Sequence, residues 1–330
     1  MTRSGGGQSW ARRALVALGG NAMSGPDGSA TELDQIAALG AAAAHIAELV
    51  AAGVQVAVTH GNGPQVGNLL VKNELSAHVV PPVSLDWCVG STQATIGFVL
   101  CDALEAELTA RGLGNRVAAL ITRTLVDSAD PAFDVPMKPV GRYLGAQDAQ
   151  RFIGLGQHWR DFGERGWRRV VASPRPVQIV DAGVAADLVA AGTVVICAGG
   201  GGIPVVRGPD GALTGVEAVI DKDLTAAILA DLLDCDALVI ATDIDNAVLE
   251  FGTSNARPLG LVRPDEMAGY IEGGHFAAGS MGPKIEAAQR FASGTCTDPA
   301  IVRTAVVTRL DRIAEALTTE PGSVGTVIRR

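Results

Sequence analysis

The chain has 330 residues, of which 48% are hydrophobic and 18% are charged, and its formal net charge is −9. This length and composition suit one large or two medium globular domains with a substantial core. The negative net charge argues against a nucleic-acid partner, which would need a strongly basic face. The one dense basic cluster, at residues 160–169, is more simply explained as a solvated or anion-facing loop.

Short apolar runs alternate with helical patterns along the chain. The patterns predict strands at residues 14–18, 54–59, 117–122, 194–198, 238–242, 305–308 and 324–328. They predict helices at residues 32–52, 86–111, 283–292 and 310–317, with a further helix directly after Ile220. Such alternation is typical of an α/β protein in which helices cover a mostly parallel sheet.

Residues 127–176 break this alternation. The segment is rich in proline, glycine, arginine and aromatic residues. Loops of this length without structure of their own are uncommon and are usually functional. We therefore expect an inserted subdomain or lid here, the alternative being a long surface connection.

Several features indicate a protein of the reducing cytoplasm that has no membrane partner. The five cysteines are scattered and form no CxxC pair, which argues against a disulfide framework or a zinc site. The apolar run at residues 14–18 is shorter than the roughly 7–15 residues of a signal peptide core. The alanine-rich stretch at residues 37–58 contains polar residues and Gly53, which favours a buried helix and strand over a membrane span.

Glycine clusters follow three of the predicted strands, at residues 19–20, 61–67 and 199–202. Ligands of open parallel sheets bind outside the carboxyl ends of the strands, and glycine lets backbone N–H groups approach an anion closely. Turn formation would explain any one cluster, but three at one edge favour a phosphate-sized ligand. The chain has no P-loop motif, and Pro64 interrupts the one glycine spacing that approaches a dinucleotide fingerprint, so a dehydrogenase is disfavoured.

Lysine is rare in this chain, and its positions are informative. Only Lys72, Lys138, Lys222 and Lys284 occur among the 26 basic residues. Lys222 and Lys284 fall in the first turns of predicted helices, where a cation opposes the helix dipole. A bound anion would remove this conflict, since helix N-termini attract phosphate and a lysine adds a point charge. The alternative is that each long side chain simply reaches solvent, as we expect for Lys72.

Acidic residues accompany these lysines. Asp221 or Asp223 can cap the helix that Lys222 begins, and Asp223 could also hold the lysine ammonium groups in place. Asp243 and Asp245 follow a predicted strand and either face a nucleotide or form a turn. His60 lies in a glycine loop where it could touch a ligand, and the histidines show neither metal-ligand spacing nor a catalytic triad.

The motifs together resemble a known family. The segments "ALVALGGNA", "VTHGNGPQVGNLL", "CVGSTQATIGF", "KPVG", "GWRRVV", "GGGGIPVV", "GVEAVIDKDLTA" and "GSMGPKIEAA" are similar, in order and spacing, to those of the carbamate kinases of the amino acid kinase superfamily. The resemblance implies an open αβα sandwich. Residues 1–190 would form an acceptor-binding and dimerising lobe with a protruding subdomain at 127–176, and residues 191–330 a nucleotide-binding lobe.

The resemblance also implies an activity and the residues that perform it. The reaction would be reversible phosphoryl transfer from ATP to carbamate with Mg²⁺, in a cytoplasmic homodimer that more often forms ATP. The implied catalytic residues are Lys222, Lys284, Asp223 and Lys138. The implied substrate-binding residues are Gly19, Gly20, Asn21, Gly61, Asn62, Gly199, Gly200 and Gly201. The implied nucleotide-binding residues are Thr242, Asp243, Met281 and Lys284, with no metal ligand among the protein side chains.

Four positions depart from the family pattern, namely Asn246, Ala172, Ala278 and Met137. They bear on nucleotide affinity and on the rigidity of the lid more than on the chemistry. Two other functions stay open: a kinase of the same superfamily that acts on another small carboxylate or phosphonate, and a binding protein without catalysis. The intact lysines argue against the second, and an acceptor screen would test the first.

Overall fold

A computed structural model describes residues 9–23, 31–276 and 281–330. Its centre is an eight-stranded sheet in the order β15-β17-β16-β12-β1-β2-β9-β3. The strands are β1 (Arg13–Leu18), β2 (Gln55–His60), β3 (Val117–Ala119), β9 (Val194–Ile196), β12 (Ala237–Thr242), β15 (Leu261–Val262), β16 (Thr304–Arg309) and β17 (Thr326–Arg329). All neighbours are parallel except β16 and β17, which confirms the predicted mostly parallel sheet.

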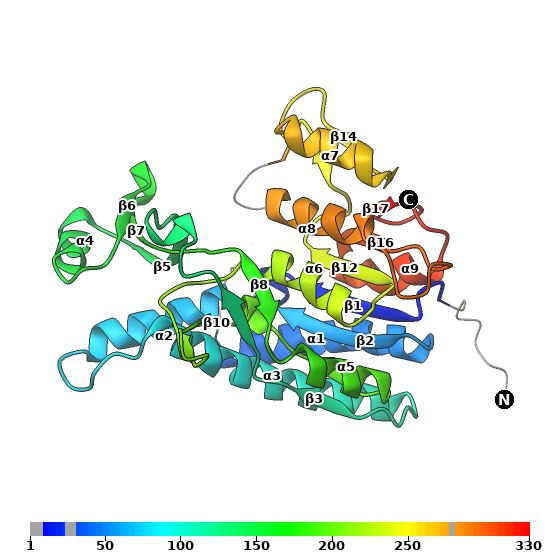
Figure 1. The fold of residues 1–330 in the computed structure, drawn as a ribbon, viewed down its shortest axis with the longest axis horizontal. Helices are drawn as coiled ribbons and strands as arrows, with labels where there is room; N and C mark the ends of the chain where they lie inside the picture. Colours follow the sequence, from blue (N-terminus) through cyan, green and yellow to red (C-terminus); the bar gives the residue numbers. More distant parts are fainter. Residues whose placement is uncertain (1–8, 24–30, 277–280) are drawn as a thin grey trace.

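Helices cover both faces of this sheet, as Figure 1 shows. Alternate residues of β1 belong to different cores, because side chains alternate along a strand: Leu15 packs on one side and Val16 on the other. The first core includes residues of α5 (Ala182–Ala190), α6 (Lys222–Leu232), α7 (Pro264–Glu272) and α8 (Met281–Ser293). The second includes residues of α1 (Glu32–Ala51), α3 (Leu85–Ala110) and α9 (Ile313–Thr318).

Some of the predicted elements differ in extent or kind from those of the structure. The strand predicted at residues 117–122 is wrong in its second half: β3 ends at Ala119 and the chain enters β4 (Arg123–Val126), which belongs to a different sheet. That smaller sheet has the order β11-β10-β4-β8, with β8 (Pro176–Ile179), β10 (Ile203–Arg207) and β11 (Leu213–Gly215). The helix predicted at residues 310–317 is a 3-10 turn, η5 (Leu310–Arg312), followed by α9.

The predicted insert has a sheet of its own, so the alternative of a plain surface connection is wrong. It contains β5 (Lys138–Leu144), α4 (Ala146–Ile153), β6 (Trp159–Asp161) and β7 (Trp167–Val171). The strands pair antiparallel in the order β5-β7-β6. Figure 1 shows this unit, in green, standing out from the body beside α2 (Gly63–Ser76). We call residues 138–171 the lid.

α1 is long and apolar enough to cross a membrane by length and composition. Its apolar residues instead pack in the second core, where Leu39, Ile46 and Leu49 are fully buried against strands and α3. The prediction of a buried helix in the alanine-rich stretch is therefore confirmed.

The topology brings five chain segments to one edge of the main sheet. Gly19 follows β1, Gly61 follows β2 and Gly199 lies just beyond β9. Thr242 and Arg309 end β12 and β16. The carboxyl ends of parallel strands form the ligand-binding edge of an open α/β sheet, so the fold positions the candidate site here.

Candidate functional site

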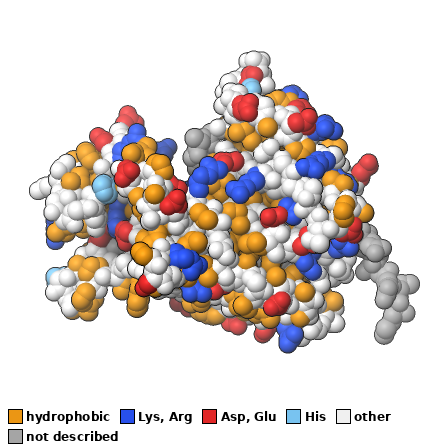
Figure 2. All heavy atoms as spheres, in the orientation of Figure 1, with side chains coloured by type: hydrophobic (Ala, Val, Ile, Leu, Met, Phe, Trp, Pro, Cys, Tyr) orange, Lys and Arg blue, Asp and Glu red, His pale blue; other side chains and the backbone are white. Residues whose placement is uncertain are grey.

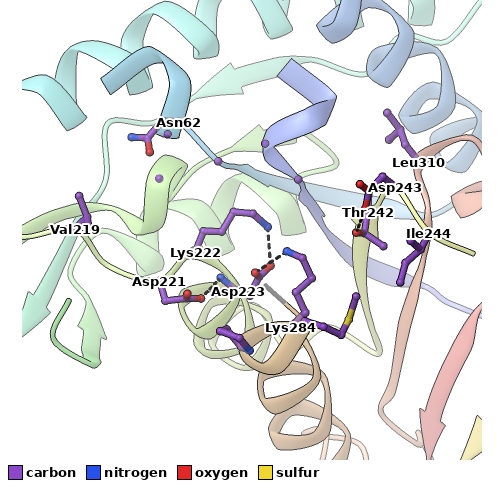
Figure 3. Close-up of a pocket in the computed structure, with 18 of the residues that line it drawn as sticks. Asn62, Val219, Asp221, Lys222, Asp223, Thr242, Asp243, Ile244, Lys284 and Leu310 are labelled. Carbon is purple, nitrogen blue, oxygen red and sulfur yellow. Dashed lines mark hydrogen bonds and ion pairs between the residues drawn. The ribbon is translucent and has the colours of Figure 1, made fainter. Parts of the chain in front are cut away.

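A cleft of about 1130 Å³ opens at this edge of the sheet. Figure 2 shows the molecule hollowed between the lid and the body. In Figure 3, Asn62 and Val219 lie at one end of the cleft, Thr242 to Ile244 and Leu310 lie at the other, and Lys222 and Lys284 lie between them. A volume of this size accommodates a nucleotide together with a small second substrate.

The centre of the cleft holds two lysines on one carboxylate. Lys222 Nζ lies 2.6 Å from Asp223 Oδ1, and Lys284 Nζ lies 2.9 Å from Asp223 Oδ2. The side chains are 13%, 16% and 6% exposed for Lys222, Lys284 and Asp223 respectively. Two ammonium groups share one carboxylate, so the group carries a net positive charge, and each ammonium group has further N–H donors beyond the one that binds Asp223.

The environment shifts the pKa values of these groups. Burial is the main reason that the pKa of Lys222 lies below its usual value; Asp223 opposes the shift and the Lys284 ammonium adds to it. Burial alone would raise the pKa of Asp223, but the two ammonium groups outweigh it and hold that pKa below its usual range. The carboxylate therefore stays ionised between two cations, an arrangement that suits a buried anion-binding centre.

Asp221, not Asp223, caps the helix that carries Lys222. Asp221 Oδ1 accepts hydrogen bonds from the backbone N–H groups of Asp223 at 3.0 Å and Leu224 at 3.3 Å. Asp221 thus satisfies the start of α6, and the side chain of Asp223 is left to bind the lysines. Lys222, the first residue of α6, stands at the positive end of the helix dipole, which makes this end strongly attractive to an anion.

The glycine run at residues 199–202 lies behind the two lysines and Asp223, and its backbone adopts left-handed conformations. Gly200 lines the cleft and has φ of 65°. A Cβ added to this residue would collide with the side chain of Asn62. Gly201 has φ of 89° and lies against the carbonyl of Ile220. The backbone therefore packs directly on the loops that precede α2 and α6, which only glycine allows.

His60 lies beneath this run and does not line the cleft, so its predicted contact with a ligand finds no support. A Cβ at Gly199 would collide with its ring. The Nδ1 atom lies 2.7 Å from the carbonyl of Gly61, and because a carbonyl only accepts, Nδ1 carries the proton. Burial lowers the pKa of His60 to about 4; the bond to Gly61 opposes the shift and Lys222 adds to it.

This buried histidine predicts a pH dependence of stability. Above pH 6.5 the ring is neutral in both states, whereas between pH 6.5 and about 4 only the unfolded chain gains the proton. The free energy of unfolding should therefore fall as the pH is lowered through this window, by up to about 3 kcal/mol in total. Urea unfolding at several pH values measures this dependence. The free energy of unfolding should change less with pH in His60→Gln than in the parent protein, and an identical pH dependence would contradict this prediction.

The far end of the cleft combines residues that follow β12 and β16. Thr242 Oγ1 donates a hydrogen bond to Asp243 Oδ1 at 3.1 Å. Arg309 and Asp311, which pair at 2.8 Å, close the end of the cleft. Asn246 does not line the cleft, because its side chain donates to the carbonyl of Leu259 at 2.8 Å. Apolar and aromatic contact comes instead from Val248, Phe251, Phe276 and Met281.

The lid contributes two cationic side chains to the lining of the cleft. Lys138 Nζ lies 3.1 Å from Asp221 Oδ2, and the lysine side chain is 39% exposed. Arg168 also lines the cleft; its Nε donates to the carbonyl of Gly141 at 2.9 Å, and its guanidinium lies over the ring of Tyr143. Cations thus outnumber carboxylates along the cleft, although the whole chain is negatively charged.

The structure brings most of the predicted site residues together. Those that line the cleft are Gly19, Gly20, Gly61, Asn62, Lys138, Gly200, Lys222, Asp223, Thr242, Asp243, Met281 and Lys284. Gly199 and Gly201 lie behind it in the turn η4 (Gly199–Gly201), and Asn21 lies in the turn η1 (Gly20–Met23). Ala172 accepts a backbone hydrogen bond from Val219, a contact that its carbonyl makes as a proline would, and Met137 contacts Arg160 through its sulfur at 3.4 Å. Ala278 lies outside the described residues.

Sequence reasoning missed several cleft residues: His45, Arg168, Ile244, Val248, Phe251, His275, Phe276, Arg309, Leu310 and Asp311. Arg309 directly follows the strand predicted at residues 305–308, so the rule that identified the glycine clusters could have found it. Arg168 belongs to the basic cluster at residues 160–169, to which the sequence alone assigns no specific ligand. His45 and the aromatic residues carried no such signal, because their approach depends on how distant segments fold together.

The fold and the cleft agree with comparisons against known proteins. The family model of the amino acid kinases matches residues 12–303. The carbamate kinase of Pyrococcus furiosus is 40% identical over 319 residues, which cover 94% of this chain and 98% of the relative. The carbamate kinase-like protein YqeA of Escherichia coli is 41% identical, covering 96% and 99%. The structure of the carbamate kinase of Giardia lamblia bound to AMP-PNP has a TM-score of 0.88 at 37% identity, covering 97% and 99%.

The family match over residues 12–303 and the mostly parallel α/β sheet thus define an amino acid kinase fold. Identity of about 40% across almost the whole chain narrows the assignment further. The chain belongs to the carbamate kinases, a family of phosphotransferases within the amino acid kinase superfamily.

Proposed function

We propose that this protein transfers a phosphoryl group reversibly between ATP and carbamate, and that it works mainly toward ATP. The observation that carries the proposal is the pair of buried ammonium groups on Asp223, which lies midway between the glycine loops and the far end of the cleft. Phosphoryl transfer needs alignment and stabilisation of charge on the equatorial oxygens, and Lys222 and Lys284 supply both.

In the ATP-forming direction, a terminal phosphate oxygen of ADP attacks the phosphorus of carbamoyl phosphate. The bond between phosphorus and the carbamate oxygen breaks, and carbamate leaves as an anion. No proton is transferred in this step, so the reaction requires no general base. The protein's task is to hold the two substrates in line, which orientation alone can favour by several kcal/mol.

The two ends of the cleft suit different substrates. Gly19, Gly20, Asn62 and the glycine run would bind carbamate, with Asn21 completing the turn after β1. Thr242, Asp243 and Met281 would bind the nucleotide, with Phe251 and Phe276 against the base. We propose an acceptor lobe at residues 1–190 and a nucleotide lobe at residues 191–330, with the glycine run at residues 199–202 reaching the acceptor end from the second lobe. The AMP-PNP in the Giardia lamblia structure supports a nucleotide in such a fold.

Magnesium would enter with the nucleotide. Among the described residues, no group of three or more histidine, cysteine, aspartate or glutamate side chains could hold a metal ion. Both oxygens of Asp223 already bind lysines. Mg²⁺ is commonly held by substrate phosphates and water with few protein carboxylates, so MgATP or MgADP as the substrate fits this donor set.

Lys138 is expected to stabilise the charge of the transition state from its position on the lid. Lys138→Ala should lower kcat/KM for carbamoyl phosphate by about 10- to 100-fold. The loss should be smaller than at Lys222, because Lys138 is more exposed and solvent screens its charge. Steady-state ATP formation measures it, with Lys72→Ala as the matched control on an exposed face of α2. Equal kinetics for both variants would exclude Lys138 from the site.

A second acceptor is the alternative that the lid leaves open. Arg168 and Lys138 both line the cleft from the lid, and together they supply more positive charge than a molecule as small as carbamate needs. An additional carboxylate or a phosphonate on the acceptor would use that guanidinium. An acceptor screen with MgATP separates the two functions: carbamate should be phosphorylated with the highest kcat/KM, and a larger acid that exceeds it would replace carbamate as the substrate.

We also propose a homodimer in the cytoplasm. The face of α3 that carries Trp87, Ala94 and Phe98 is exposed, with Trp87 and Phe98 at 68% and 58%, and β3 is an edge strand of the main sheet. Large exposed aromatic residues on one face are typical of an interface. Sedimentation should give twice the mass of the chain, and the double variant W87E/F98E should sediment as a monomer. A monomeric parent protein would contradict the proposal.

A further inference from the structure

The base of the lid is joined to the segment that leads directly into α6. Arg169 of the lid lies 2.5 Å from Glu217 Oε1. The backbone N–H of Val219 donates to the carbonyl of Ala172 at 3.0 Å, in a short parallel bridge. Lys138 then contacts Asp221, as described above. We call residues 217–221 the docking segment, and it ends one residue before Lys222.

Asp221 uses its two carboxylate oxygens for different partners. Oδ1 caps α6 at the backbone of Asp223 and Leu224, and Oδ2 pairs with Lys138 Nζ. The Asp221 carbonyl also accepts the Thr225 backbone N–H and hydroxyl, both at 3.0 Å. The Asp221 side chain is 15% exposed, and two backbone N–H groups in the first turn of α6 hold its Oδ1 atom. The carboxylate that meets the lid lysine is therefore a rigid part of the helix that carries Lys222 and Asp223.

Lys138 needs such a partner more than the other two site lysines do. It begins β5, and the backbone there is placed by its pairing with Val171. Its flexible side chain is more exposed than those of Lys222 and Lys284, which Asp223 holds. Restricting a lysine side chain costs conformational entropy, and an ion pair formed in advance removes that cost from the binding step.

We propose that Asp221 is a positioning residue for the lid lysine, in addition to capping α6. It directs the Lys138 ammonium to the start of α6, so that all three lysines converge on one phosphoryl group. This inference rests on the proposed function. It assigns to Asp221 alone, at the end of the docking segment, the task of directing the lid lysine toward the catalytic helix.

The test uses a substitution that keeps the cap and removes only the ion pair. Asp221→Asn retains Oδ1, and asparagine caps helices as well as aspartate does. It places an amide N–H₂ where Lys138 meets Oδ2, so a donor faces a donor. We expect kcat/KM for carbamoyl phosphate to fall at least about tenfold, because misplacement of a substrate-positioning group costs up to about a hundredfold. Thermal unfolding should change little.

The double-mutant cycle with Lys138→Ala identifies the route of the effect. If Asp221 acts through Lys138, adding Asp221→Asn to Lys138→Ala should lower kcat/KM by less than about threefold further. Independent losses that multiply would overturn the inference and leave Asp221 as a cap and a local charge near Lys222. Unchanged kinetics in Asp221→Asn alone would overturn it as well.

Glu217→Gln is the matched control, because it also replaces a carboxylate that binds the lid. It removes the ion pair with Arg169 but can still accept the backbone N–H of Leu85, at 3.0 Å in the parent protein. Its kcat/KM should stay within about twofold of the parent, and a loss equal to that of Asp221→Asn would mean general loosening of the lid and contradict the inference. A parent protein that forms no ATP would instead refute the proposed function. Hydrogen exchange then still tests the contact: β5 amides should exchange faster in Asp221→Asn than in the parent.

Discussion

Replacing Lys222 with alanine is expected to lower kcat by about a thousandfold or more while the protein still folds. Lys222 is buried at the positive end of α6 and pairs with a carboxylate that Lys284 also holds. Its charge is therefore in a region of low dielectric, where stabilisation of the transferred phosphoryl group is strong. Binding of the nucleotide base should be nearly unaffected, because Lys222 lies away from Thr242 and Ile244 at the far end of the cleft (Figure 3).

The measurement needs controls for folding and for the loss of any lysine. Lys222→Met keeps most of the aliphatic chain and should lose as much activity as Lys222→Ala, which assigns the effect to the charge. Lys72→Ala should keep the parental kcat, since that lysine is exposed on α2. Thermal unfolding should show that Lys222→Ala retains a cooperative transition, because Asp223 still has Lys284 as its partner. Turnover near the parental value in Lys222→Ala would refute this role.

The substitution Asp223→Asn is expected to have the second largest effect, and it should affect both stability and activity. It leaves two ammonium groups close together in a buried place without their shared counter-charge. Breaking a buried ion pair from one side costs about 3–5 kcal/mol, which urea unfolding would measure directly. The lysines should also move apart, so kcat should fall by at least about a hundredfold.

Asp223→Asn also has a distinctive pH dependence. Asp223 raises the pKa of Lys222, against the effects of burial and of Lys284. Without the carboxylate, that pKa should fall further, and Lys222 would lose its proton as the pH rises at a lower pH than in the parent protein. The alkaline limb of the pH profile of the residual kcat should therefore shift to lower pH. A limb at the parental pH would show that Lys222 does not titrate in the observed step.

Much of the architecture could be predicted because its signals are local. The buried strands β1, β2 and β12 read as short apolar runs, and α3 as a long helical pattern. The prediction was wrong where the apolar run is longer than the strand. The stretch predicted as one strand at residues 117–122 ends at Ala119 in β3, residues 120–122 belong to no strand, and β4 of the smaller sheet begins at Arg123. Nothing within the run itself marks the point at which the chain leaves the main sheet.

The centre of the site was accessible from sequence for a physical reason. A lysine in the first turn of a helix conflicts with the helix dipole, and Lys222 and Lys284 both lie in the cleft at such positions. The two uses of Asp221 were not accessible, because one oxygen meets the adjacent turn and the other meets a lid lysine 83 residues away. Phe251 and His45 were missed for the same reason, since only the packing of distant segments brings them to the cleft.

The most direct test is ATP formation from MgADP and carbamoyl phosphate by the purified protein, followed with a coupled assay. The account predicts rapid ATP formation by the parent protein and by Lys72→Ala, and almost complete loss in Lys222→Ala. Absence of ATP formation by the parent protein, in a preparation that binds ADP by calorimetry, would contradict the account. The fold and the nucleotide end of the cleft would then stand, and the acceptor would have to be a different acid.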